Sequence, residues 1–388
     1  MNLLIVSHTP HYRDDSAIVG WGATVREIDH LASLFDRVTH LAPLHPEKAP
    51  ASSLPYTTKN IRFRAVSPAG GDTFSARLRV LRCIPDYIYA IWQEIKIADV
   101  VHVRCPAAIS LVALLLLVFI KKPVYRWVKY AGNWKPEGKS PFTYRLQRWL
   151  IARNVFRGVA TINGSWKGQP RHIHSFYNPC LTEDELLEGK NLTRRFTTPY
   201  QILFAGRLER AKGVETVLQV AAELKKSEFS FETILIGDGP EREKYLKQAE
   251  AMRLEKTVRF EGWIPRNELG KYYSRAHFIL LPSETEGWPK VLSEAMAYGV
   301  VILACNISSI PQILELTGSG LALDPQKPES YRSEIIGLVR NPERWEEFSQ
   351  SGIRHASLFT YNYYLRSLSK LMQDSWGIDF SMNKDFSS

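Results

Sequence analysis

Residues 286–299, EGWPKVLSEAMAYG, carry two glutamates eight positions apart where a predicted strand meets a predicted helix. The apolar run at 277–281 that precedes them predicts a buried strand. Pro289 suits the first position of a helix, where a missing N–H costs nothing, and Gly299 suits the helix end. The pattern therefore places Glu286 in the loop before a helix and Glu294 in its second turn.

A strand end followed by a helix start is the edge at which open α/β sheets bind their ligands. Two carboxylates at this edge would accept hydrogen bonds from several hydroxyl groups, as a polyhydroxy ligand such as a sugar or a ribose requires. The spacing alone leaves a second interpretation open, in which Glu286 is a solvated loop residue and Glu294 lies on a helix surface.

Apolar, β-branched runs alternate with helical patterns along the whole chain. The first half predicts strands at 2–7, 37–42, 61–66, 100–104, 124–129 and 159–162, and helices at 22–34, 75–97, 107–120 and 142–153. The second half predicts strands at 201–205, 231–236, 257–260, 277–281 and 300–304, and helices at 213–226, 240–252, 267–274 and 289–298. Alternation of this kind predicts parallel sheets with crossover helices, and hence an α/β fold.

Length and composition favour two globular domains. The chain has 388 residues, of which 45% are hydrophobic and 23% charged. We expect one domain at residues 1–178, a polar, proline-containing linker at 179–199 and a second domain at 200–360. The four cysteines show no metal-ligand spacing, and the apolar run at 109–120 is too short to span a bilayer and predicts a buried helix. The start of the chain lacks a basic leader, so we expect a cytoplasmic protein.

Charge is distributed unevenly between the two halves. Residues 1–200 hold 27 Lys and Arg against 15 Asp and Glu, a net charge of +12, whereas residues 201–388 hold 23 against 25, a net charge of −2. The asymmetry suggests that the first half meets an anionic partner, for which an anionic membrane surface, nucleic acid and an ordinary basic surface are the alternatives. The basic residues that contribute are Arg62, Arg64, Arg77, Arg79, Arg82, Lys121, Lys122, Arg126, Lys129, Lys135 and Lys139.

Cationic and glycine residues follow the other predicted strand ends of the second half. Gly206 and Arg207 follow the strand at 201–205, and Lys212 comes just before the next helix. Glycine permits close approach of a backbone to phosphate, arginine binds phosphate oxygens in pairs, and lysine adds a point charge. The exposed backbone near Trp263 could contact a nucleobase edge. Together with the two glutamates, these residues outline a site for a nucleoside diphosphate.

The chain resembles the retaining glycosyltransferases of family 4 (glycosyl transferases group 1), which have the GT-B fold. The resemblance covers the whole chain and is strongest over 202–323, where it rests on the segments ILFAGRLERAKGVETVL, LIGDGPEREK, VRFEGWIP, SETEGWPKVLSEAMAYG and ACNISSIPQIL. It implies two Rossmann-like domains that face a central cleft. It also implies that a final helix, within 361–378, packs back on the first domain.

The resemblance implies a role for each residue of the predicted site. Arg207 and Lys212 would bind the donor diphosphate and stabilise the transition state, Glu286 would lie near the transferred sugar, and Glu294 would bind the ribose hydroxyls. The remaining donor-binding positions that it implies are Gly20, Gly22, Gly206, Trp263, Gly287, Trp288, Lys290 and Val291.

The first half departs from the family pattern on the acceptor side. The family commonly has a catalytic-site histidine after the strand at 124–129, and none stands there. Tyr130, Asn133 or a residue of the loop at 8–13 would take its place. Pro289, where many relatives have glycine, removes one backbone donor from the phosphate site.

The reaction implied is transfer of a sugar, of the hexosyltransferase type, from a nucleotide-sugar to an acceptor hydroxyl with retention of configuration. No Asp-x-Asp pair is present, so we expect no metal and no other cofactor. The basic first half suggests a lipid-linked glycan as acceptor, in surface polysaccharide biosynthesis at the inner face of a membrane, and no nucleic acid. Two alternatives remain, another GT-B enzyme such as a nucleotide-sugar epimerase or a phosphorylase, and a basic nucleic-acid-binding protein.

Overall fold

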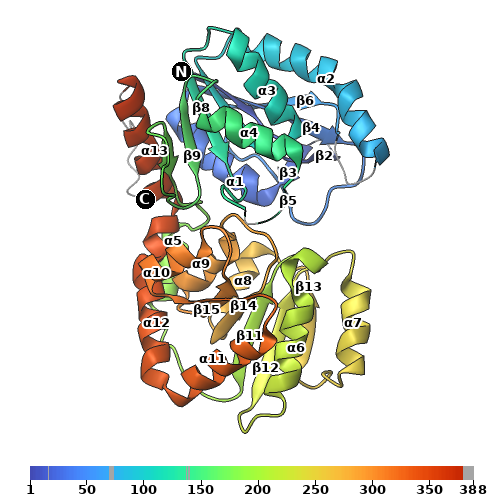
Figure 1. Cartoon of the computed structure of the whole chain (residues 1–388), viewed down its shortest axis with the longest axis vertical. Coiled ribbons are helices and arrows are strands. Elements are labelled where there is room, and N and C mark those ends of the chain that lie inside the picture. The colour runs from blue at the N-terminus through green and yellow to red at the C-terminus, as the bar shows by residue number, and fades with distance from the viewer. Residues whose placement is uncertain (16, 70–73, 137, 139, 379–388) are drawn as a thin grey trace. The chain divides into compact units, whose positions relative to one another are not determined.

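The computed structural model describes residues 1–15, 17–69, 74–136, 138 and 140–378, with the backbone alone for 74–79. The chain divides into two compact units (Figure 1). The first unit comprises Met1–Phe176 and the chain from Tyr364 onward, and the second comprises Tyr177–Tyr363. The side chains of Arg77, Arg79 and Lys139, which were counted with the basic residues, lie outside the described part.

The first unit consists of a mostly parallel sheet and helices. Its strands are β1 (Asn2–Val6), β2 (His11–Asp14), β3 (Ala17–Trp21), β4 (Arg37–His45), β5 (Ser53–Pro55), β6 (Ile61–Val66), β7 (Val100–Cys105), β8 (Tyr125–Tyr130), β9 (Val159–Ile162) and β10 (Ile173–Ser175). Its helices are α1 (Gly22–Leu31), η1 (Ala32–Leu34), α2 (Phe74–Ile95), α3 (Ala108–Phe119), α4 (Phe142–Ala152) and most of α13 (Tyr361–Trp376).

The parallel strands of this unit run in the order β10-β9-β8-β7-β1-β4-β6. The central strands β1, β7, β8 and β9 are buried on both faces, which explains why nearly all their residues are buried. One face packs against α2, α3 and α4 through a core that includes Ile91, Leu114 and Ile151. The other face packs against α1 and α13 through a core that includes Ile28 and Leu368.

A short hairpin was not predicted. Strands β2 and β3 pair antiparallel, with His11 opposite Gly20, and β5 pairs with β3. The polar β2 sequence HYRD lacks the apolar alternation that identifies a strand. Gly20, one of the expected donor-binding positions, lies in strand β3, and α1 begins at Gly22.

The second unit is a fully parallel α/β unit with the strand order β13-β12-β11-β14-β15-β16. The strands are β11 (Tyr200–Ala205), β12 (Phe231–Ile236), β13 (Val258–Gly262), β14 (Phe278–Leu281), β15 (Val301–Cys305) and β16 (Gly320–Leu323). The helices are α5 (Glu183–Lys190), η2 (Arg210–Lys212), α6 (Val214–Leu224), α7 (Arg242–Ala251), α8 (Arg266–Tyr273), α9 (Lys290–Ala297), α10 (Ile310–Thr317), α11 (Pro328–Arg340), α12 (Pro342–His355) and η3 (Ala356–Phe359).

The strand order of this second sheet has a topological switch point between β11 and β14. The chain leads from β11 outward to β12 and β13, and then returns to β14 on the other side of β11. At such a point the loops that leave the two strands diverge and open a crevice at the carboxyl edge. The predicted α/β class, with two parallel-sheet, Rossmann-like units, is confirmed.

The chain around the expected linker differs from the prediction. Residues 183–190 form α5, which begins with a capping box between Thr182 and Glu185. Leu181 is buried and pairs with Thr360 in an isolated bridge, so this segment is integral to the second unit. From Tyr364 onward α13 packs in the first unit, where Leu368 and Met372 are buried.

The apolar run at 109–120 forms α3, and the prediction that this helix is buried is only half right. Ala113 and Leu117 are fully buried, whereas Leu115 and Phe119 are exposed to solvent. Of the helices that the structure describes, none has both the length and the hydrophobicity that crossing a bilayer requires.

Candidate active site

The loops that leave β11 and β14 are packed backbone to backbone at the switch point of the second sheet. Gly213 has φ +71°, and a Cβ there would lie 2.0 Å from the Pro282 carbonyl oxygen. Beside this contact, the Glu284 N–H donates to the Ala211 carbonyl at 2.9 Å. Only glycine fits this approach and this backbone conformation, so the sequence AKG after β11 holds the two loops together.

The loops after β12 and β13 join the same layer. A Cβ on Gly237 would lie 1.9 Å from the Gly206 carbonyl oxygen, and one on Gly239 would lie 2.4 Å from that of Leu208. The Gly237 N–H donates to the Gly262 carbonyl at 2.8 Å. These glycines do more than shape a turn, because they allow four consecutive strand ends of the second unit to form one continuous rim.

Two of the predicted catalytic side chains meet on this rim. Lys212 Nζ lies 2.5 Å from Glu286 Oε1, with side-chain exposures of 26% and 9%. An ammonium group has three N–H donors, so two remain for further acceptors such as phosphate oxygens. Arg207 is not part of this pair, since its side chain is 65% exposed and its Nε lies 3.2 Å from Glu209 Oε2.

Glu294 belongs to a separate, buried network. One carboxylate oxygen accepts from Arg266 and the other accepts from the Tyr273 hydroxyl at 2.9 Å. Arg266 also pairs with Glu185 at 2.9 Å and donates to the Cys180 carbonyl at 2.5 Å. Burial lowers the pKa of Arg266, but Glu294 and Glu185 outweigh it and raise the pKa overall. Burial and Glu294 raise the pKa of Tyr273.

Sequence reasoning missed Arg266, the first residue of α8. The signal was present, because a proline and an arginine follow the β13 strand end at the start of a helix. Each remaining Glu294 lone pair is still an acceptor, so a ribose hydroxyl and Arg266 can share the carboxylate.

The turn before α9 is fixed by Trp288, whose side chain lies in the core. Its indole stacks on Phe359 at 5.3 Å between ring centroids and donates to Ser293 Oγ at 2.7 Å. Any ligand contact from Trp288 must therefore come from its backbone. The Gly287 carbonyl accepts from Ser309 at 3.0 Å. Pro289 occupies the N-cap of α9, one position before the predicted one.

Other predicted donor-binding positions of the second unit are accessible to solvent. Gly206, Lys290 and Val291 are partly buried, and Trp263 is 43% exposed just after β13. An exposed indole at a strand end is available for stacking on a ring.

In the first unit, Gly20 and Gly22 are required by close packing. A Cβ on Gly20 would lie 2.5 Å from His11 Nε2, and one on Gly22 would lie 2.7 Å from the Ser52 carbonyl oxygen. The Gly22 N–H donates to that same carbonyl at 3.0 Å. This N–H is therefore already used within the unit, and the role in donor binding expected of both glycines stays a prediction.

The two acceptor-side candidates are held by hydrogen bonds within the first unit. Tyr130 is buried at the end of β8, where its hydroxyl accepts from Arg148 Nη1 at 2.9 Å, and burial raises its pKa. Asn133 Oδ1 accepts from the Lys135 N–H at 3.1 Å. His8, in the segment 8–13, is exposed at the carboxyl end of β1.

Behind that segment lies a chain of four hydrogen-bonded side chains. Ser7 Oγ lies 2.6 Å from His40 Nε2, and the Tyr56 hydroxyl lies 2.5 Å from His40 Nδ1 and 2.8 Å from His11 Nε2. His11 Nδ1 must donate, because its partner at 2.9 Å is the Thr9 carbonyl. Burial lowers the pKa of both histidines, that of His11 to about 4, so both are neutral at pH 7.

Some basic residues counted toward an anionic partner are not on the surface. Lys129 Nζ lies 2.6 Å from Glu27 Oε1, and Arg104 pairs with the same carboxylate at 2.7 Å. Arg126 donates to main-chain carbonyls, among them those of Leu117 and Phe156. The charge of the first half is thus partly internal, and its exposed part is smaller than the count suggests.

No cluster of three or more His, Cys, Asp or Glu side chains suited to a metal ion occurs among the residues that the structure describes.

Part of the second unit matches a known protein family. Residues 190–355 match the family described as Glycosyl transferases group 1. This group 1 region contains the switch-point loops, Lys212 and both glutamates.

The chain is also similar to curated proteins and to solved structures. It is 30% identical over 217 residues to an uncharacterised glycosyltransferase of Haemophilus influenzae, covering 55% of this chain and 54% of that protein. It is 32% identical over 129 residues to a putative colanic acid biosynthesis glycosyltransferase of Escherichia coli K12, covering 32% of each. The chain thus spans about half or less of the length of these relatives.

A crystal structure of the Anabaena protein HepE in complex with UDP has the same fold. It superposes with a TM-score of 0.66 at 14% identity and covers 96% of this chain and 100% of that one.

Proposed function

We propose that this protein is a retaining, metal-independent glycosyltransferase that transfers a sugar from a nucleotide-sugar to a hydroxyl of a lipid-linked glycan. The observation that carries the proposal is the pair Lys212–Glu286 at the switch point of the second unit, within the group 1 region. It joins a cation suited to a diphosphate with a carboxylate suited to sugar hydroxyls.

The charge that develops during the reaction lies on the leaving diphosphate. Lys212, with two N–H donors not used by Glu286, and the exposed Arg207 supply positive charge without a metal ion. Because these groups are attached to a rim of packed backbone, they need little reorganisation as charge develops. Glu286 would face the transferred sugar, and its salt bridge fixes its orientation.

The nucleoside would lie on the other side of the same rim. Glu294, held by Arg266 and Tyr273, would accept hydrogen bonds from the ribose, and the backbone near Trp263 would contact the base. The relative HepE was crystallised with UDP, which supports a uridine nucleotide as the first donor to test.

The acceptor proposal rests on the first unit. Its basic charge favours an acceptor presented at an anionic membrane surface on the cytoplasmic side. The similarity to a putative colanic acid biosynthesis glycosyltransferase supports a surface polysaccharide as the product.

Donor binding can be tested without knowing the acceptor. Thermal unfolding would be followed with UDP, GDP and ADP and their sugars, since a ligand that binds only the folded state raises Tm. The proposal expects one nucleotide class to raise Tm, with the effect lost in Lys212→Ala. Once a donor is found, the anomeric configuration of the first product formed, followed by NMR, tests retention, and an assay in excess EDTA tests metal independence. A donor consumed equally fast without any acceptor would favour an epimerase instead.

A further inference from the structure

Helix α3 has an unusual surface for a water-facing element. Its sequence AISLVALLLLVF contains no charged residue. Ala113, Leu114 and Leu117 face the core, but the side chain of Leu115 is 42% exposed and that of Phe119 is 84% exposed. A surface helix normally turns charged residues outward, so an uncharged outer face points to a partner that is not water.

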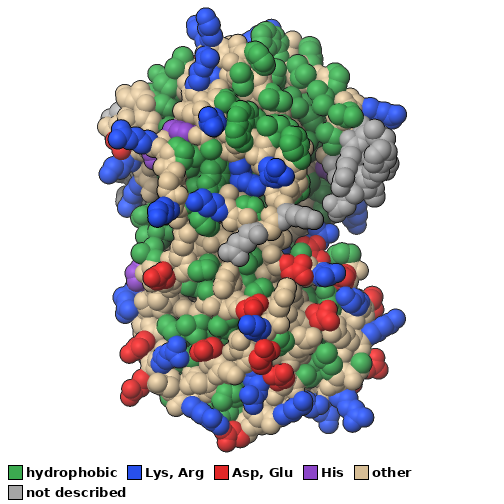
Figure 2. Space-filling view, viewed as in Figure 1, with side chains coloured by type: hydrophobic (Ala, Val, Ile, Leu, Met, Phe, Trp, Pro, Cys, Tyr) green, Lys and Arg blue, Asp and Glu red, His purple; other side chains and the backbone are tan. Residues whose placement is uncertain are grey.

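The two helices that flank α3 extend this apolar face. α2, α3 and α4 cover the same side of the sheet, and α2 and α4 both pack against α3. We call the exposed apolar residues of this layer and of its edge the apolar surface; they are Leu81, Ile88, Tyr89, Trp92, Ile97, Leu115, Phe119, Val124, Phe142, Tyr144 and Trp149. Figure 2 shows hydrophobic side chains gathered over this part of the first unit, with Lys and Arg between them.

The exposed charges around the apolar surface are predominantly positive. Among the described residues on and beside α2, α3 and α4, the exposed basic residues include Arg82, Lys96, Lys121, Lys122, Arg145 and Arg153, against the exposed acid Asp99. The nearby acid Glu94 is buried and already paired with Arg62. Aromatic side chains mixed with lysine and arginine are the composition of surfaces that rest at the headgroup level of a bilayer.

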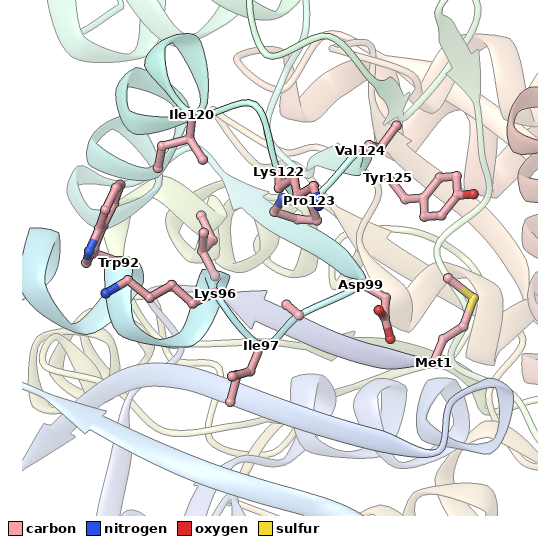
Figure 3. Close-up of a pocket in the computed structure, with 12 residues that line it drawn as sticks. Met1, Trp92, Lys96, Ile97, Asp99, Ile120, Lys122, Pro123, Val124 and Tyr125 are labelled. Atoms are coloured by element: carbon pink, nitrogen blue, oxygen red, sulfur yellow. The ribbon is translucent and has the colours of Figure 1, made fainter.

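A cavity of about 820 Å³ opens at the edge of the apolar surface. It lies between the end of α2 and the chain that links α3 to β8, and its walls include Trp92, Ile97, Ile120 and Val124. Lys96 and Lys122 line it too, and Lys96 Nζ lies 5.2 Å from the centre of the Trp92 ring. Figure 3 shows Trp92 and Lys96 on one side of the cavity and Ile120 and Pro123 on the other. An apolar floor with ammonium groups beside it is complementary to an acyl chain below an anionic headgroup.

The location of this cavity also fits a docking role. It lies at the amino ends of β1, β7 and β8, where Met1, Asp99 and Tyr125 line it. The candidate acceptor-side residues Tyr130 and His8 lie at the carboxyl ends of β8 and β1, so the length of a strand, roughly 20 Å, separates them from the cavity. A membrane at the apolar surface would leave the carboxyl edge of the sheet accessible.

We propose that the apolar surface of α2, α3 and α4 docks onto a bilayer that contains anionic phospholipids, and that the edge cavity receives an acyl chain. This inference rests on the proposed function in that it names the membrane at which that enzyme meets a lipid-linked acceptor. Lys96, Lys121 and Lys122 contact the headgroups, while Leu115, Phe119 and Val124 enter the interfacial layer.

Vesicle binding of the full chain tests the proposal. Wild type and variants would be sedimented with phosphatidylcholine vesicles, with and without phosphatidylglycerol, at low and high salt. The test variants are Lys121→Glu/Lys122→Glu and Leu115→Ser/Phe119→Ser, all at exposed positions. Matched controls in the second unit are Lys247→Glu/Lys256→Glu and Leu316→Ser.

We expect wild type to bind only vesicles that contain phosphatidylglycerol and to be released by salt. Each lysine lost should weaken partitioning roughly fivefold, so the double reversal should weaken it by about 25-fold or more. The Leu115→Ser/Phe119→Ser variant should weaken partitioning by a comparable factor, because it lacks the two apolar side chains that enter the interfacial layer. The control variants should bind like wild type.

Other results would overturn the proposal. Wild type that fails to sediment with anionic vesicles at low salt would do so, as would test variants that bind like wild type. If wild type is instead a dimer that Leu115→Ser/Phe119→Ser converts to a monomer, the apolar surface is a contact between two copies of this chain. The nucleotide that raises the Tm of wild type should raise the Tm of every variant equally. A failure of vesicle binding can therefore be distinguished from a failure of the proposed glycosyltransferase function.

Discussion

Glu286 and Glu294 lie in different electrostatic surroundings although one short segment carries both. Glu286 faces one lysine at the rim of the second unit, with a side chain that is 9% exposed. Glu294 meets an arginine whose side chain is 18% exposed and a buried tyrosine hydroxyl. The first carboxylate has one partner, which is partly exposed and can be solvated, whereas the second is part of a network of several mutually bonded groups. The two should therefore respond differently to mutation.

Replacement of Lys212 by alanine should lower kcat by about a hundredfold or more, because the charge that it supplies to the leaving diphosphate is preorganised. Arg207→Ala should have a similar effect. Arg210→Ala is the matched control, since Arg210 lies between them in sequence, is 82% exposed and faces Glu284. Steady-state kinetics on the identified donor measures all three. Turnover of Lys212→Ala at the wild-type rate, with an intact fold by circular dichroism, would remove Lys212 from the mechanism.

Glu294→Ala should destabilise the second unit by about 3 kcal/mol, because it removes one of the two carboxylate partners of Arg266, whose side chain is only 18% exposed. Glu286→Ala should cost less than about 1 kcal/mol, since Lys212 is partly exposed and can be solvated. Urea unfolding measures both values. Calorimetric titration of UDP into the folded variants, without urea, should show weakened binding in Glu294→Ala and near-normal binding in Glu286→Ala. Steady-state kinetics should show slow turnover in Glu286→Ala. Equal stability losses in the two variants would contradict this assignment.

At the scale of the elements, the rim of the second unit depends on glycines that let separate loops touch. Gly213 lies between η2 and α6 and meets the backbone that follows β14. The contact brings Lys212, one position earlier, to the loop that carries Glu286. The absence of a side chain at position 213 therefore determines both the contact between the two loops and the position of Lys212 beside Glu286.

Gly213→Ala should lower stability by about 2 kcal/mol or more, because alanine is strained at φ +71° and its Cβ would overlap the Pro282 carbonyl. It should also lower kcat by displacing Lys212. Gly337→Ala is the contrasting variant, since Gly337 lies inside α11 with open space around it, and alanine there should stabilise by up to about 1 kcal/mol. Thermal unfolding of the two proteins measures the difference. A Gly213→Ala protein as stable and active as wild type would refute the packing argument.

The sequence predicted the elements whose periodicity is strong and missed those that are set by tertiary contacts. Apolar runs such as 201–205 and 277–281 identified parallel strands, since both faces of such strands are buried. Strand β2 and helix α5 were missed, because their polar residues gain partners only in the folded unit. The partial exposure of α3 was missed as well, because an apolar run indicates that a helix can be buried but not which of its faces another element covers.

The same distinction applies to the site. Lys212 and Glu286 were predicted from the motifs that carry them, and the structure brings them into contact. The helix start marks the position of Arg266 but not its role, because its importance arises from residues 28 and 81 positions away along the chain. Pairing across such distances is decided by the sheet order, which local patterns do not encode.

At the scale of the whole molecule, each unit holds a buried neutral histidine that makes its stability sensitive to acid. Burial lowers the pKa of His11 in the first unit and of His277 in the second to about 4. Each would have a pKa of about 6.5 when unfolded. Below pH 6.5 the unfolded chain therefore binds a proton that the folded unit does not, so stability falls from pH 6.5 down to about pH 4.

Each unit should lose about 2 kcal/mol of stability between pH 7 and pH 5 from its histidine. His40, with a pKa also lowered by burial, should add to the loss in the first unit. Urea unfolding followed by hydrogen exchange with mass spectrometry resolves the two units. His11→Gln should flatten the pH dependence of the first unit alone, and His277→Gln that of the second alone. An unchanged pH slope in both variants would show that other groups control acid unfolding.

Arg266 joins three segments of the second unit that are distant in sequence, at Cys180, Glu185 and Glu294. A buried guanidinium cannot lose its proton, so a lineage that replaces Glu294 must replace Arg266 or retain an acid at position 185. We therefore expect positions 185, 266 and 294 to vary together among natural homologues. Positions 212 and 286, whose pair is partly exposed, should show no such compensation, and each should instead be fixed by its own contact with substrate. Statistical coupling between columns of an alignment would thus show whether position 294 is constrained by its partners within the unit as well as by the ribose.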